Sequence, residues 1–435
     1  ANESVGFQQA IPAPRDEIVE AAAWVSAAID LIYQYDDLLA ADWRERVMLR
    51  IVLDEAQQAG LEDEPLFDSL IRDWHRALPY HRPPKRSDYL RHRVETFQIF
   101  LQDRLHALPD EAQDRVTERY AAEREERLAA YLDQMTVLNA LTPTTYQEQK
   151  TPIPIWRACI GFIWKGRITL LPICRRNAEG SPLCYPPHED APPVPLFAHG
   201  KTGLCDAHGT ALIVDRGGRV RYADTQRPLG HLRAPAPEDI RGWLAAIFDR
   251  KSKHRPSRVD VRLAESERKA QTQLREKLPR ATQTELTLLR RAPILINWDE
   301  HPVEKPLAVI RRDHRGIGDH ALTLFRTRQS TVFDQSHIFF DGLWGMAVAE
   351  IMTDNATHIY RDMSEQSTAA APLPLSALKL ESSEAFESQA KQHRLGGETA
   401  AESNGVDMKR LSRLRKQLRQ RGVRLTINDL LLLYR

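Results

Sequence analysis

The residues best suited to chemistry are a histidine, an aspartate and a glycine that follow a short apolar segment. Residues Thr331–Ser336 have the composition of a strand, which delivers His337 to its end. Asp341 and Gly342 follow in a tight turn, and helical spacing then resumes. Histidine has an unperturbed pKa of about 6.5, so an imidazole at such a junction could act as a general base. The segment therefore predicts a site at a strand-to-helix junction.

The spacing H-x-x-x-D alone decides little, because it occurs twice more, at His106–Asp110 and His358–Asp362. Both copies lie on helical or helix-end segments. Only the copy at His337 adds a glycine, which leaves room for a substrate or permits an unusual backbone angle. In the alternative interpretation, His337 is a packed strand-end residue and Asp341 is a helix N-cap.

Cysteines and histidines also gather in the middle of the chain, and thiolate with imidazole suits tetrahedral zinc. Their spacing is irregular and lacks a C-x-x-C element, which favours ordinary buried cysteines and loop histidines over a metal site. We therefore expect no metal. The residues in question are Cys174, Cys184, His188, His199, Cys205 and His208.

The elements that position His337 are predicted from apolar runs upstream. Helical spacing over Leu263–Arg291 is followed by candidate strands at Ile294–Trp298, Leu307–Ile310 and Ala321–Phe325. Residues 364–404 are mostly polar and predict a long surface connection. We therefore expect a small sheet whose last strand ends at His337.

A second signature lies near the end of the sequence. Residues Val406–Arg421 form a basic amphipathic helix pattern, and Thr426-x-Asn428-Asp429 then leads into another helix. With His337-x-x-x-Asp341-Gly342, these segments resemble the superfamily that includes chloramphenicol acetyltransferase, carnitine acyltransferases, peptide-synthetase condensation domains and wax ester synthases. The resemblance covers about residues 293–435, which correspond to the first half of that two-lobed fold.

The resemblance implies a role for each residue of the motif. His337 would take the proton from an attacking hydroxyl, amine or thiol, Asp341 would hold the loop, and Gly342 would keep the channel open. The acyl donor would be a thioester of coenzyme A or a carrier protein. No metal or redox cofactor is implied.

The second lobe of that fold has no counterpart in the sequence, because no D-F-G-W-G-like segment occurs and the chain stops within Leu430–Leu433. We expect a C-terminal continuation or a protein partner to complete the lobe and to cover these leucines. The alternative is a non-catalytic scaffold or assembly protein that uses a degenerate acyltransferase-like fold and binds partners through its helical region.

Three regions are predicted along the chain, which together give a mixed α/β (α+β) fold. Residues 1–150 show helical apolar spacing and predict a helical domain. Residues 151–258 predict a small β-rich domain with hairpins around Lys165-Gly166 and Gly217-Gly218, followed by a helix over Pro237–Arg250. Residues 259–435 predict the acyltransferase-like N-terminal lobe.

Composition excludes several function classes. The 435 residues carry 61 basic and 60 acidic side chains, and the net charge of +1 gives no global attraction to nucleic acid or to anionic membranes. The basic stretch in 410–424 lacks an aromatic platform for bases. No apolar run approaches the roughly 20 residues of a membrane helix, and four cysteines do not resemble a secreted disulfide framework. We expect a cytoplasmic protein.

Overall fold

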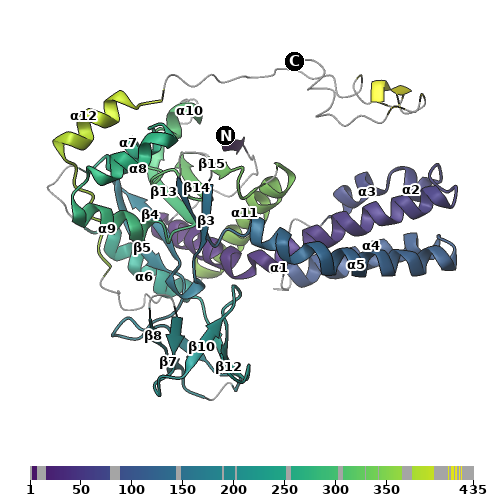
Figure 1. Cartoon of the computed structure of the whole chain (residues 1–435), viewed down its shortest axis with the longest axis horizontal. Coiled ribbons are helices and arrows are strands. Elements are labelled where there is room, and N and C mark those ends of the chain that lie inside the picture. The colour runs from purple at the N-terminus through teal and green to yellow at the C-terminus, as the bar shows by residue number, and fades with distance from the viewer. Residues whose placement is uncertain are drawn as a thin grey trace. The chain divides into compact units, whose positions relative to one another are not determined.

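The structure is a computed structural model of the whole chain (Figure 1). It divides into two compact units, residues 1–395 and 396–435. It describes residues 2–6, 16–78, 89–143, 148–188, 191–200, 203–250, 256–301, 307–328, 330–340, 342–364, 375–395, 410, 413–415, 417, 418, 421 and 423. The described residues of the second unit include short helical pieces at 413–415 and 417–418. Thr426, Asn428, Asp429 and Leu430–Leu433 lie outside the described residues.

A six-stranded mixed sheet forms the centre of the first unit, in the order β1-β15-β14-β13-β4-β5. Its strands β4, β13 and β14 are parallel, and every other neighbouring pair is antiparallel. The strand bounds are β1 (Asn2–Gly6), β4 (Cys159–Trp164), β5 (Arg167–Pro172), β13 (Ile294–His301), β14 (Leu322–Thr327) and β15 (Thr331–Ser336).

Both faces of this sheet are covered by helices, as Figure 1 shows. Side chains alternate along β13, so that Ile294 and Ile296 join one apolar cluster while Leu295 joins another. The first cluster includes side chains of α1 (Glu17–Gln58), α6 (Pro237–Phe248) and α11 (Gly342–Ser364). The second includes α7 (Val259–Ala264), α8 (Arg268–Glu276), α9 (Arg280–Leu289) and α12 (Glu384–Gln392). The result is a three-layer α/β/α core.

Helix α1 begins at an N-cap, Asp16, whose carboxylate accepts hydrogen bonds from the backbone N–H groups of Ile18 and Val19. Its first half is rich in buried alanines, which allow neighbouring backbones to approach closely, and it packs on α11 and α6. The ring of Trp24 meets Phe333 of β15 edge-on at 6.0 Å. The N-terminal helix is therefore part of the sheet core.

The second half of α1 belongs to a helical arm with α3 (Leu70–Ala77), α4 (Tyr89–His106) and α5 (Asp110–Met135), preceded by the short α2 (Pro65–Asp68). A separate apolar cluster holds this arm together, with Trp74 against Phe97 at 4.8 Å. The predicted helical character of the N-terminal region is confirmed. None of the helices in the described ranges is long and apolar enough to cross a bilayer.

A second, seven-stranded sheet is built from the middle of the chain, in the order β7-β6-β12-β11-β10-β9-β8. Its strands are β6 (Leu183–Tyr185), β7 (Val194–Pro195), β8 (Phe197–His199), β9 (Gly203–Cys205), β10 (Ala211–Val214), β11 (Arg219–Tyr222) and β12 (Pro228–Leu232). The hairpin predicted around Gly217-Gly218 is β10–β11. A two-stranded ribbon, β2 (Asn139–Pro143) and β3 (Glu148–Pro152), joins the helical arm to the core.

The hairpin predicted around Lys165-Gly166 is also confirmed, but it pairs with β13 in the central sheet. The central sheet thus combines strands from all three of the regions expected to be separate, while the boundaries at 150/151 and 258/259 stay predictions. The two-lobed architecture also stays a prediction, whereas the mixed helix and sheet content is confirmed.

The helical character predicted over Leu263–Arg291 is confirmed, mainly as α8 and α9, with Pro279 as the N-cap of α9. Two local expectations are wrong. Residues Leu307–Ile310, expected as a strand, form the short helix α10 (Leu307–Ile310). Residues Glu384–Gln392, expected within a long connection, form α12, which Ser383 caps through its hydroxyl.

Candidate functional site

His337 is the first residue after β15, and its side chain is exposed to solvent. It opens the turn 337–339, and α11 begins at Gly342. The predicted strand, turn and helix are therefore confirmed. Asp341 lies outside the described residues, and of Gly342 only the backbone is described, so the structure does not test their predicted roles.

Backbone hydrogen bonds fix the turn that carries His337. The carbonyl oxygen of Ser336 accepts from the N–H groups of Phe339 at 2.9 Å and Phe340 at 3.2 Å, and the N–H of Ser336 donates to Ala321 at 3.0 Å. The start of the turn is thus tied to the beginning of β14. Such a turn presents one side chain from a rigid support.

The aromatic residues that follow His337 attach the turn to α1. Phe339 and Phe340 are buried, and the ring of Phe340 lies edge-on to Tyr35 at 6.3 Å. The indole Nε1 of Trp344, in the first turns of α11, donates to the hydroxyl of Tyr35 at 2.9 Å. These contacts bury the residues on the C-terminal side of the turn while His337 faces solvent.

A buried ion-pair group supports β15 from the face of the sheet opposite to the one that α1 covers. Asp334 is 4% exposed and lies 3.1 Å from Arg311 Nε and 3.2 Å from Arg315 Nη1. Removing one partner from such a group leaves an uncompensated buried charge. The strand that carries His337 is therefore held through Asp334 as well as through its backbone.

Lys150, which sequence patterns did not single out, contacts the turn directly. Its Nζ donates to the carbonyl oxygen of Ile338 at 3.2 Å and to that of Gln134, and it lies 5.0 Å from the centre of the Phe339 ring. Burial lowers the pKa of Lys150 below its ordinary value. A lone lysine in the polar hairpin β2–β3 carries no motif, so only the fold reveals this contact.

A second group of acid and base side chains lies at the opposite end of the strands, where the parallel strands β13 and β14 end. His301, the last residue of β13, pairs with Thr327 at the end of β14, whereas Ser336 is bonded to Ala321, just before the start of β14. Ala321 and Thr327 are six residues apart along β14, which corresponds to roughly 20 Å. His337 and His301 therefore belong to different sites.

The imidazole of His301 is enclosed, being 4% exposed. Its Nε2 lies 3.1 Å from Asp313 Oδ2, and its Nδ1 lies 3.0 Å from the carbonyl oxygen of Arg326. Burial opposes protonation of His301, but these two partners raise its pKa above the ordinary value. The hydrogen bond with His301 lowers the pKa of Asp313 to about 2. The hydrogen bond therefore joins an enclosed imidazole to a partly exposed carboxylate and favours the charged form of both groups.

His314 is paired in a similar way, with its Nδ1 3.0 Å from Asp260 Oδ2. Burial opposes its protonation, yet the hydrogen bond and charge of Asp260 raise its pKa. Asp299, on β13, accepts from the backbone N–H groups of Lys165 and Gly166 in the turn of the β4–β5 hairpin. These contacts hold the β4–β5 hairpin, α7 and the loop after α10 together, which indicates a structural role.

The two other copies of the H-x-x-x-D spacing lie on helices, as expected. His106 ends α4 and Asp110 begins α5. His358 lies within α11, where its Nδ1 is 2.9 Å from the carbonyl oxygen of Asp354. Neither stands at the end of a strand, so the position of His337 distinguishes it from both.

The cysteines are buried and unbridged, with Cys174 and Cys184 fully enclosed. Burial raises the pKa of Cys184 to about 11, so its thiol stays protonated near neutral pH. Cys205 is also buried, and the N–H of His208 donates to Asp206 at 2.9 Å in the turn that follows. Within the part of the chain that the structure describes, no three His, Cys, Asp or Glu side chains are grouped to hold a metal.

No model of a known protein family matches this sequence, and no curated protein matches it detectably. The acyltransferase resemblance consequently depends on the motif residues themselves. The site is defined by His337 and the groups that hold its turn.

Proposed function

We propose that the chain is an acyltransferase that moves an acyl group from a coenzyme A or carrier-protein thioester to a hydroxyl, amine or thiol, with His337 as general base. The observation that supports this proposal is the exposed His337 side chain on a turn whose neighbours are fixed to β14 and α1. A general base needs this combination of access to the acceptor and a rigid support.

In the proposed reaction, His337 accepts the proton of the acceptor as the acceptor attacks the thioester carbonyl carbon. A tetrahedral oxyanion forms and then collapses, which breaks the carbon–sulfur bond. The leaving thiolate takes the proton from the imidazolium, so His337 returns to its neutral form. The products are the acylated acceptor and a free thiol, and no electrons are exchanged.

Asp341 and Gly342 keep the roles that the resemblance implies. Asp341 would hold the loop by accepting hydrogen bonds, and Gly342 would leave space for the substrate at the start of α11. The donor would approach through a second lobe supplied by a continuation of the chain or by a protein partner.

The test is thioester-dependent transfer measured by release of free thiol, with the chain assayed together with any protein that completes the second lobe. His337→Ala should lower turnover by roughly a hundredfold or more, since positioned proton transfer contributes about 10² to 10⁴. His358→Ala is the matched control, because it shares the H-x-x-x-D spacing but lies within α11. Its turnover should stay near the wild-type value. Full turnover in His337→Ala would exclude the proposed role.

The second candidate function is a scaffold that binds a protein partner through the helical arm. It is favoured by Ile99 on α4 and Ile71 on α3, which are 70% and 48% exposed. Isolated exposed apolar residues are common, so these two alone are weaker support than the position of His337. Absence of thioester-dependent transfer in the complete assembly would favour the scaffold.

A further inference from the structure

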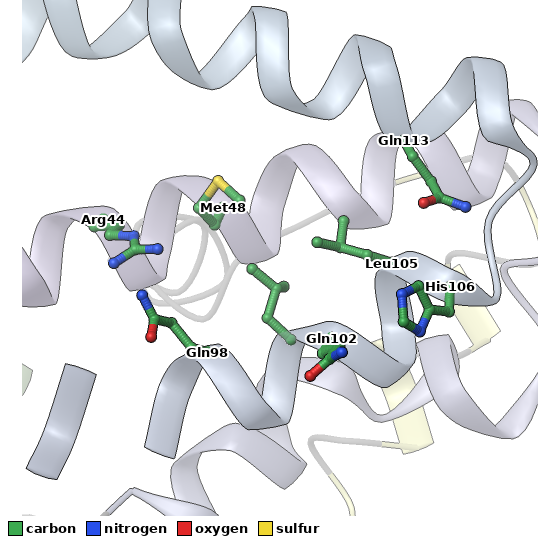
Figure 2. A pocket seen from close by; sticks show the side chains of 8 residues that line it. Arg44, Met48, Gln98, Gln102, Leu105, His106 and Gln113 are labelled. Carbon is green, nitrogen blue, oxygen red and sulfur yellow. The ribbon is translucent and has the colours of Figure 1, made fainter. Parts of the chain in front are cut away.

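A pocket of about 310 Å³ opens between α1, α4 and α5 in the helical arm (Figure 2). Its volume lies at the lower end of the range for small-molecule sites, roughly 300–1,000 Å³. It is distant in sequence from His337 and lies in a different apolar cluster. The pocket is therefore independent of the proposed acyl-transfer site.

One end of the pocket carries a cation. Figure 2 shows Arg44 of α1 and Gln98 of α4 close together there. Among the residues that the structure describes, Arg44 forms no ion pair, and its guanidinium lies 5.9 Å from the centre of the Phe97 ring. Neighbouring arginines of the arm are paired with carboxylates: Arg46 with Asp42, Arg50 with Glu123, Arg93 with Glu45, and Arg115 and Arg119 with Glu55.

The middle of the pocket is mainly apolar, with Gln102 beside the apolar side chains (Figure 2). Met48 and Leu101 are 8% and 4% exposed, and Leu105 lines the same wall. At the far end, Figure 2 shows His106 of α4 and Gln113 of α5. The pocket thus has a positive end, a mainly apolar middle and a far end lined by hydrogen-bonding side chains.

We propose that this pocket binds a small amphipathic carboxylate, with the carboxylate on Arg44 and Gln98 and the hydrocarbon over Met48, Leu101 and Leu105. No acidic side chain lines the pocket in the described part of the chain, so a cationic ligand would find no counter-charge. An arginine fork binds a carboxylate through two N–H groups, and the glutamine amide adds a further donor. A neutral alcohol would leave the guanidinium without its partner.

The probe is hexanoate, titrated into the full chain and followed by saturation-transfer NMR. We expect saturable binding with a dissociation constant on the order of 1 mM for a ligand of this size. Hexanol and hexylamine should bind at least about tenfold more weakly, and added salt should weaken hexanoate binding because the arginine is partly exposed.

Arg44→Gln should weaken hexanoate binding by about tenfold or more, since it removes a charge-assisted contact. The matched control is Arg104→Gln on α4, an arginine outside the pocket whose Nη1 donates to the Phe100 carbonyl oxygen. It should bind hexanoate like the wild type. The proposal is overturned if wild-type binding does not saturate by about 20 mM, far above the expected constant. Hexylamine binding as tight as hexanoate, or undiminished binding in a folded Arg44→Gln variant, would overturn it equally.

Discussion

Arg93 of α4 provides the sharpest test of what stabilises the helical arm. The side chain is fully buried, and its Nε and Nη2 donate to the two carboxylate oxygens of Glu45 at 2.7 and 2.8 Å. Nη2 also reaches Asp42 at 3.1 Å. Glu45 is 3% exposed and accepts one further hydrogen bond, from Trp74 Nε1 at 3.1 Å. This bidentate pair connects α1 to α4 inside the arm.

Replacing Arg93 with methionine should lower the free energy of unfolding by about 3–5 kcal/mol, because Glu45 would remain buried with Trp74 as its main donor. The loss should diminish at acidic pH, where Glu45 can take up a proton instead. Urea unfolding followed by circular dichroism at pH 7 gives the value.

Two further variants decide whether the reasoning is right. Arg127→Met removes an exposed arginine, 3.5 Å from Glu126, and should change stability by less than about 1 kcal/mol. The double variant Arg93→Met with Glu45→Leu should recover most of the loss, because no buried charge then remains unpaired. A cost below about 1 kcal/mol for Arg93→Met, or a double variant as unstable as the single one, would refute the argument.

Two other predictions concern the contacts around His301 and the β4–β5 hairpin, at the carboxyl ends of the parallel strands. Because the pKa of His301 is raised in the folded state, its contribution to stability is complete below about pH 6.5 and is lost as the pH rises through the folded pKa. His301→Gln should therefore flatten the pH dependence of urea unfolding above pH 6.5, by at most about 1.4 kcal/mol per pH unit, and an unchanged slope would contradict the assignment. Gly166 has a φ of +68° and Gly60 a φ of +73°, so replacing either with alanine should lower the free energy of unfolding by about 1–2 kcal/mol through backbone strain. A Cβ at Gly166 would also lie 2.8 Å from Pro256, whereas the space at Gly60 is open, so Gly166→Ala should lose more stability than Gly60→Ala. Equal losses in thermal or urea unfolding would show that the contact with Pro256 relaxes at no cost.

Local features of the fold could be predicted from the sequence because their causes are local. The strand Thr331–Ser336 and the helix after Gly342 follow from side-chain periodicity, and the hairpin turn at Lys165-Gly166 follows from a glycine where φ is positive. The position of His337 at a strand end was predicted in this way. Its exposure, by contrast, depends on the burial of Phe339 and Phe340 against distant elements.

Long-range pairing could not be predicted, since periodicity does not specify the partner of a strand. The sequence pattern of the hairpin β4–β5 is the same whether the hairpin belongs to a small middle domain or pairs with β13, more than 120 residues later. The four apolar residues Leu307–Ile310 are too few to distinguish strand from helix. Lys150 and the carboxylate partners of His301 and His314 come from separate segments, so their association with these sites required the fold.

The packing of α1 on elements from the far end of the chain has a consequence for biosynthesis. Tyr35 bonds to Trp344, 309 residues later, and Trp24 packs on Phe333. At about 5–20 residues per second, a ribosome would need roughly 15–60 s to produce those partners after α1 emerges. Throughout that interval the part of α1 that packs on β15 and α11 would lack its native cover. The nascent chain should therefore be a substrate for chaperones that shield apolar helices, and a pause in translation before residue 330 should increase its aggregation.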